Sequence, residues 1–114
     1  MIRIAVIRIP DGTLKQFTLS GHAQYSRHGE DIVCAAVSGI SIGLINAVEE
    51  LLGVDLAPEE SVDGGYLSVH VPTELPHPVK RQVQLLLEGM LVALRQVAET
   101  YPAYVAWEEE TESV

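Results

Sequence analysis

The segment DIVCAAVSGISIGLINAVEELLG, residues 31–53, is a long apolar run between two stretches with strand character. Asp31 stands directly before the run, which is typical of an N-cap whose carboxylate accepts hydrogen bonds from the free amides of the first helical turn. Gly53 can adopt the left-handed conformation that ends a helix. We therefore predict a helix that ends near Leu52, and we expect it to be buried because it is apolar nearly all round.

A stripe of small residues follows one side of this predicted helix and consists of Ala35, Ala36, Gly39 and Gly43. Each Gly lowers helix propensity by about 1 kcal/mol relative to Ala, but small side chains let another backbone approach closely. We expect the second helix to pack there. The charge-free residues 32–48 fall just short of the ~18 residues of a membrane-spanning helix, so we interpret them as the core helix of a soluble protein.

Strands are predicted before this helix. Residues 2–9 are rich in Ile and Val, Pro-Asp-Gly at residues 10–12 favours a turn, and residues 14–20 place apolar side chains among polar ones. This pattern predicts a hairpin. The polar residues 24–30 then predict a loop that leads into the helix.

A second strand region and a second helix follow. The Asp-Gly-Gly sequence at residues 63–65 favours a turn, and residues 66–71 alternate between apolar and polar side chains. Over residues 78–101 apolar side chains recur at steps of three and four, which is typical of an amphipathic helix, and Pro102 ends it. Residues 103–107 predict a last short strand. The order ββαββαβ predicts an α+β fold, with a mixed or antiparallel sheet packed against two long helices.

Length and composition predict one domain. A chain of 114 residues with 47% hydrophobic residues can bury one core, which we assign to residues 1–109, and we expect residues 110–114 to form an acidic, solvated tail. Sixteen Asp and Glu against seven Lys and Arg give a net charge of −9. This charge has the wrong sign for binding nucleic acid and suits a basic partner.

The cellular compartment is predicted from the cysteine and the N-terminus. The single Cys excludes an intramolecular disulfide and fits a reducing cytosol. The first twelve residues, MIRIAVIRIPDG, lack the regions of a signal peptide. We therefore expect a cytoplasmic protein with no membrane partner.

The candidate chemistry centres on Cys34, in the first turn of the predicted helix. Unpaired amides at a helix N-terminus act as about half a positive charge, which favours the thiolate and lowers a cysteine pKa from ~8.5. A thiolate with a nearby imidazole forms a nucleophile and base pair. His22, at the end of a predicted strand, is the first candidate for the base, and His28, in the loop, is the competitor.

Three further groups could assist this pair. Asp31 could orient the imidazole or only cap the helix, and Ser38, one turn from Cys34, could donate to the thiolate or polarise a substrate carbonyl. The amides of Val33 and Cys34 could form an oxyanion hole. Against catalysis, a lone Cys in an apolar helix is more often a small buried hydrophobe.

A metal site is the weaker alternative. His22, His28 and Cys34 could hold a metal ion, but no carboxylate is spaced to join them. We expect neither a metal nor a cofactor.

Specific residues of this region resemble a known signature. Gly21-His22-Ala23, then Gly29, then residues 31–38, DIVCAAVS, are similar to the signature of the ribosomal-processing cysteine protease family, Prp. Asn46, the turn at residues 63–66, the second helix and the chain length extend the similarity to nearly the whole chain. Gln24 and Gly43 depart from the pattern, and neither is a proposed catalytic group.

The resemblance implies a cytoplasmic bacterial endopeptidase that removes the N-terminal extension of large-subunit ribosomal protein twenty-seven. Cys34 would be the nucleophile and His22 the base. We assign Gly21, Ala23, Tyr25 and Gly29 to a substrate-binding loop that closes over the peptide. The alternatives are a non-catalytic module that binds a ribosomal protein or assists ribosome assembly, and an acyl or thioester hydrolase that uses the same pair.

We also expect a homodimer, which the resemblance implies as well. The second helix has more apolar side chains than one core-facing stripe needs, and the surplus would be buried between two copies. These surplus side chains are Leu85, Leu87, Leu91 and Val92.

Overall fold

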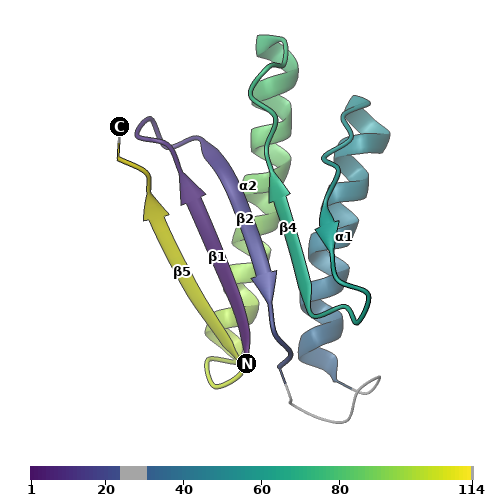
Figure 1. The fold of residues 1–114 in the computed structure, drawn as a ribbon, viewed down its shortest axis with the longest axis vertical. Coiled ribbons are helices and arrows are strands. Elements are labelled where there is room, and N and C mark those ends of the chain that lie inside the picture. The colour runs from purple at the N-terminus through teal and green to yellow at the C-terminus, as the bar shows by residue number, and fades with distance from the viewer. Residues whose placement is uncertain (24–30, 114) are drawn as a thin grey trace.

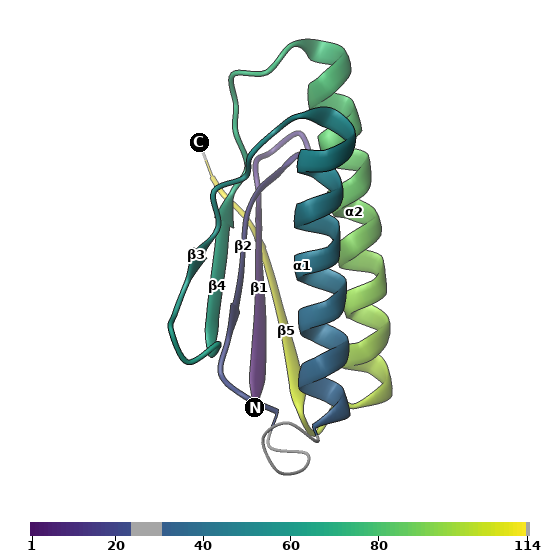
Figure 2. The same cartoon turned by 90° about the vertical axis from the view of Figure 1, so that its right-hand side faces the viewer.

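The computed structural model of the chain describes residues 1–23 and 31–113, and it has two layers. A five-stranded sheet forms one layer, and two helices lie side by side on one of its faces (Figure 1, Figure 2). In chain order the elements are β1 (Ile2–Arg8), β2 (Leu14–Ser20), α1 (Ile32–Leu52), β3 (Glu59–Glu60), β4 (Tyr66–His70), α2 (His77–Thr100) and β5 (Val105–Thr111). The predicted order and the α+β class are confirmed. The predictions for Tyr25, His28 and Gly29 lie outside the described residues.

The sheet is mixed, with the strand order β3-β4-β2-β1-β5. β1 pairs in parallel with β5, and the other neighbouring strands are antiparallel. Strands β2 and β3 therefore run in the same direction, as do β4 and β5, and α1 and α2 are the helices that connect them. Because both connections cross the same face, no helix of the described residues covers the other face of the sheet (Figure 2).

The core lies between the sheet and the two helices. Strand side chains alternate between the two faces, so Ile4, Phe17 and Val69 point toward the helices and are fully buried. From α2, Leu87 and Leu91 are also fully buried. This corrects the prediction that they are surplus, because the monomer itself buries them. Leu85 and Val92 remain 73% and 53% exposed.

Helix α1 begins and ends where the sequence predicts. Asp31 caps its first turn, and Gly53 ends it with a φ of 68°. The prediction that the whole helix is buried is wrong, since its buried residues form one face: Val33, Val37, Ser41, Ile45 and Val48. Within the described residues no third layer covers the helices, so the outer side of α1 faces solvent. The helix is also long and apolar enough to span a membrane. Its composition therefore fits a membrane as well as the helix layer of this fold.

Three of the four small residues of the predicted stripe on α1 face solvent instead of α2, contrary to the prediction. Ala35, Gly39 and Gly43 are exposed. A Cβ placed at either glycine would have no neighbouring atom within 4 Å among the described residues. The larger side chains of Ile40 and Leu44 pack against the core instead.

The predicted acidic tail is wrong in its first residues. Glu110 and Thr111 belong to β5, where Thr111 lies opposite Arg8, and the amide of Glu112 donates to the carbonyl of Arg8 over 2.7 Å. Cations of β1 contact two carboxylates of β5, which offsets the repulsion among the acidic side chains at this edge. These pairs are Arg3 with Glu108 and Arg8 with Glu109, and Lys15 of β2 contacts Glu112 just after the strand.

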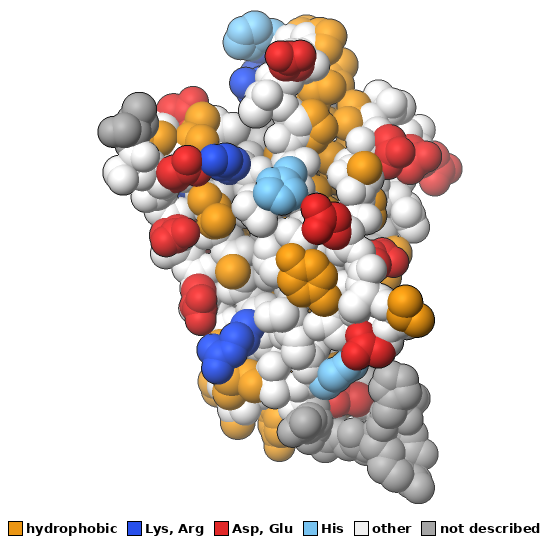
Figure 3. All heavy atoms as spheres, viewed as in Figure 1, with side chains coloured by type: hydrophobic (Ala, Val, Ile, Leu, Met, Phe, Trp, Pro, Cys, Tyr) orange, Lys and Arg blue, Asp and Glu red, His pale blue; other side chains and the backbone are white. Residues whose placement is uncertain are grey.

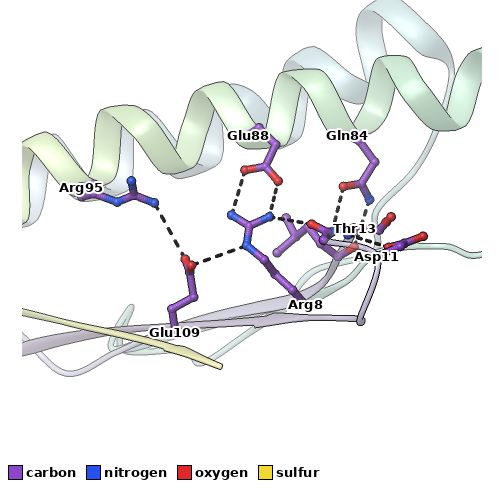
Figure 4. A network of polar contacts seen from close by, with 9 residues as sticks. Arg8, Asp11, Thr13, Gln84, Glu88, Arg95 and Glu109 are labelled. Atoms are coloured by element: carbon purple, nitrogen blue, oxygen red, sulfur yellow. Dashed lines mark hydrogen bonds and ion pairs between the residues drawn. The ribbon is translucent and has the colours of Figure 1, made fainter. Parts of the chain in front are cut away.

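Arg8 connects β1 with both β5 and α2 (Figure 4). Its guanidinium donates two hydrogen bonds to Glu88 of α2 and lies 3.6 Å from the carboxylate of Glu109. Arg95 of α2 lies 3.8 Å from the same carboxylate of Glu109. The hydrogen bond with Glu88 raises the pKa of Arg8 further above its ordinary value. This partly buried network fastens α2 across the β5 edge of the sheet.

The side-chain amide of Gln84 fastens α2 to the start of β2. Its carbonyl accepts from the amide of Leu14 over 2.9 Å, and its NH₂ group donates to the carbonyl of Leu14 over 3.0 Å. Leu14 is 1% exposed, and β1 opposite it has an irregular register between Ile7 and Arg8. Gln84 therefore supplies the hydrogen bonds that a regular neighbouring strand would make.

We predict that Gln84→Ala lowers the free energy of unfolding by about 1–3 kcal/mol, because it leaves both backbone groups of a buried residue unpaired. Urea denaturation measures the change. Gln82→Ala, at an exposed position of the same helix, is the control and should change stability by less than about 0.5 kcal/mol. Equal losses in the two variants would show that the Gln84 hydrogen bonds contribute no stability.

Candidate active site

A cleft of about 990 Å³ opens between the N-terminal half of α1, the end of β2 and the turn that connects β3 to β4. Among the side chains that line it are His22, Asp31, Cys34, Ser38 and Asp63. The first four were predicted from the sequence as parts of one site, and the fold places them around one cavity. Asp63 comes from a distant part of the chain.

Cys34 is half-buried in the first turn of α1. Its Sγ accepts a hydrogen bond from the amide of Ala23 over 3.3 Å. A donor at the sulfur favours the thiolate, as does the positive end of the helix dipole. The position therefore suits a nucleophile better than a buried packing residue.

His22 enters the cleft because the chain turns sharply at Gly21. Gly21 has a φ of 84°, and a Cβ there would lie 2.3 Å from the carbonyl oxygen of Met1. Its amide donates to the carbonyl of Gly65 over 2.8 Å. Gly21 is thus required by the backbone, while the buried Ala23 supports the sulfur of Cys34 through its amide.

Asp31 is confirmed as the cap of α1, and its geometry corrects another prediction. Its Oδ1 accepts from the amide of Val33 over 2.9 Å and from the amide of Cys34 over 3.0 Å. These two amides were predicted to form an oxyanion hole, but the carboxylate already engages them. That Asp31 also orients His22 stays a prediction.

Ser38 lies one turn along α1 from Cys34, lines the same cleft and is exposed. Its hydroxyl is therefore accessible to a peptide bound there. Within residues 1–23 and 31–113, no three His, Cys, Asp or Glu side chains gather as metal ligands would.

The turn at residues 63–65 is the part of the site that sequence analysis missed. Asp63 Oδ1 accepts from the hydroxyl of Ser61 over 2.6 Å and from the amide of Gly65 over 3.0 Å. The hydrogen bond from Ser61 lowers the pKa of Asp63 most, followed by that from Gly65, and the attraction of His22 adds to them. The two consecutive glycines were a signal for this site. The turn has one positive φ, at Gly64, and therefore needs only one glycine, so the second one indicates a close approach by another group.

Comparison with known proteins identifies the family. The family model described as cysteine protease Prp matches residues 1–106. The chain belongs to the Prp family of cysteine proteases. It is 36% identical over 101 residues to the ribosomal processing cysteine protease Prp of Bacillus subtilis, covering 89% of this chain and 90% of that protein. It is 33% identical over 95 residues to the Prp of Mycoplasma pneumoniae, covering 83% and 87%.

Solved structures agree with this assignment. The ribosomal processing protease Prp from Staphylococcus aureus, in complex with a covalently linked product peptide, superposes with a TM-score of 0.86 at 27% identity and covers 96% of this chain and 100% of its own. A Streptococcus mutans protein superposes with a TM-score of 0.83 at 35% identity, covering 98% and 96%. The chain is a cysteine protease of the Prp family, which disfavours the non-catalytic module.

We predict that Asp31→Ala lowers the free energy of unfolding by about 1 kcal/mol, because the first turn of α1 loses its cap. Asp31→Asn keeps an oxygen acceptor and should retain most of that stability. Urea denaturation of both variants measures the difference. If Asp31→Asn were as unstable as Asp31→Ala, the charge of Asp31, rather than its hydrogen bonds, would be what stabilises the helix.

Proposed function

We propose that the chain removes the N-terminal extension of large-subunit ribosomal protein twenty-seven in the cytoplasm, with Cys34 as nucleophile and His22 as base. The observation that carries this proposal is the placement of Cys34. Its sulfur lies in the first turn of α1 and accepts from the amide of Ala23, directly after His22, and both side chains line one cleft. The names of the relatives support a ribosomal protein as substrate.

The reaction has two stages. The thiolate of Cys34 attacks the carbonyl carbon of the scissile peptide bond, the C–N bond breaks, and the imidazolium of His22 gives its proton to the leaving amine. A thioester then joins the extension to the sulfur. In the second stage His22 takes a proton from water, the hydroxide attacks the thioester, and the thiolate leaves as a carboxylic acid forms, which then loses its proton to solvent.

The charge around the cleft supports a basic substrate. Its lining includes Asp31, Glu60 and Asp63, and contains neither Lys nor Arg among the described residues. The sequence has no Lys or Arg between Asp31 and Lys80. The surface over β3 and the β3–β4 turn, on the right of Figure 3, accordingly shows acidic side chains and no Lys or Arg. Such a surface attracts a cationic protein and repels nucleic acid.

We predict that Cys34→Ser and His22→Ala each reduce kcat for cleavage of the precursor by at least about 10³-fold while the fold is kept, because the two groups act as one unit. Mass spectrometry of the precursor after incubation measures cleavage, and circular dichroism monitors the fold.

His28→Ala is the matched control and should retain most of the activity. Loss of activity in His28→Ala but not in His22→Ala would show that His28 is the base. Faster alkylation of Cys34 than of a free thiol at pH 6 provides an independent measure of the thiolate.

We also propose that the chain forms a symmetric homodimer through the outer side of its helix layer. The support is the set of large apolar side chains that α1 and α2 expose there, together with the homodimers that the family resemblance implies. On α2, Leu85 and Val92 are two turns apart and share one side of the helix. On α1, Ile32 and Ile42 are 54% and 43% exposed.

For the homodimer we predict a sedimentation mass of twice 12.4 kDa at micromolar concentration, and a shift of Val92→Glu toward the monomer, because a charge would be buried at the interface. Val62→Glu is the control, since Val62 is fully exposed on the β3–β4 turn. A wild-type mass of one chain would refute the dimer. An unchanged dimer in Val92→Glu would place the interface elsewhere.

A further inference from the structure

The turn between β3 and β4 is held against His22 and has no part in the reaction proposed above. The amide of Gly21 donates to the carbonyl of Gly65 over 2.8 Å. This hydrogen bond ties the turn to the residue that precedes His22. The pairing of β4 with β2, in which Tyr66 lies opposite Ser20, keeps the two segments in register.

The glycine at position 65 is explained by His22 rather than by its own backbone. Among the described residues the positive-φ glycines are Gly12, Gly21, Gly53 and Gly64, so Gly65 has a conformation open to other residues. A Cβ at Gly65, however, would lie 2.9 Å from Nε2 of His22 and 3.4 Å from Oδ1 of Asp63. The imidazole nitrogen and the carboxylate oxygen thus both border the space that a side chain would fill.

The carboxylate of Asp63 is fixed in this position. Its Oδ1 accepts from the Ser61 hydroxyl and the Gly65 amide, which are donors within the same turn. These two hydrogen bonds and the attraction of His22 lower the pKa of Asp63. The group therefore carries its negative charge throughout the pH range in which an imidazole titrates.

We propose that Asp63 is a positioning residue of the protease reaction: its fixed carboxylate stabilises the protonated ring of His22, and through that ring the thiolate of Cys34. The inference rests on the proposed function, in which His22 is the base. It adds a charge from a turn far along the sequence to the pair formed by His22, just after β2, and Cys34 on α1. Asp63 touches neither the substrate nor the sulfur in this role.

Other titratable groups line the same cleft, and their effects on His22 must be separated from that of Asp63. They are Asp31 at the start of α1, Glu60 on β3 and Tyr66 on β4. Asp31 is committed to the amides of α1. Glu60 lines the cleft with the same charge as Asp63 but is exposed, and no hydrogen bond of the turn involves it. Glu60→Gln is therefore the matched control for the loss of one negative charge.

The test is Asp63→Asn, which removes the charge and keeps an oxygen that can accept from Ser61 and Gly65. NMR titration of the His22 ring in the full chain, assigned by comparison with His22→Ala, measures the coupling. We expect its midpoint to fall in Asp63→Asn, because the protonated ring loses a nearby opposite charge. Glu60→Gln should shift it much less.

Activity gives the second measurement. For a peptide copied from the processing site of the ribosomal protein precursor, the alkaline limb of kcat/KM should move to lower pH by the same amount in Asp63→Asn. KM should change less than twofold, since Asp63 does not bind the peptide in this role. Asp63→Glu restores a charge and should restore part of the shift.

Two results would overturn the inference. One is an unchanged His22 midpoint in Asp63→Asn, and the other is an equal shift in Glu60→Gln, which would assign the effect to the general field of the cleft. If the wild-type chain left the peptide uncut, the proposed function would fail, whereas the NMR titration would still decide whether Asp63 and His22 are coupled.

Discussion

The hydrogen bonds from the amides of Val33 and Cys34 to the carboxylate of Asp31 decide where α1 begins, and the cleft depends on that start. They place Cys34 in the first turn, where the helix dipole favours a thiolate. Oδ1 engages both amides, and the sulfur accepts a hydrogen bond from another segment, at the amide of Ala23. The cap thus connects the stability of α1 with the geometry of the nucleophile.

The two-layer architecture explains how α1 can contribute to the hydrophobic core and also line the cleft. One side of α1 covers the sheet and contributes to the core, and an adjacent side forms a wall of the cleft with Cys34 and Ser38. The opposite wall is the β3–β4 turn, which strand pairing holds against the end of β2. The site therefore forms where the start of α1, the end of β2 and the β3–β4 turn meet, and none of these segments could form it alone.

Charged side chains are arranged differently at the β5 edge and around the cleft. Cations of β1 and α2 contact the carboxylates of β5, and Lys15 of β2 contacts Glu112 just beyond that strand. The residues between Asp31 and Lys80 contain no Lys or Arg, so the acidic groups around the cleft keep their field. Such a field attracts cationic groups to the cleft.

The sequence by itself determined the features that depend on neighbouring residues: the cap at Asp31, the end of α1 at Gly53, the turn before β2 and the spacing of apolar residues in α2. It also singled out Cys34 and His22. Only the tertiary structure decided that the outer side of α1 is exposed, because hydrophobicity does not say how many layers cover a helix. The continuation of β5 through Thr111 depends on its pairing with β1, in which Thr111 lies opposite Arg8. The approach of Asp63 to His22 depends on the register of β4 against β2, which is set by packing across the sheet and not by any local pattern.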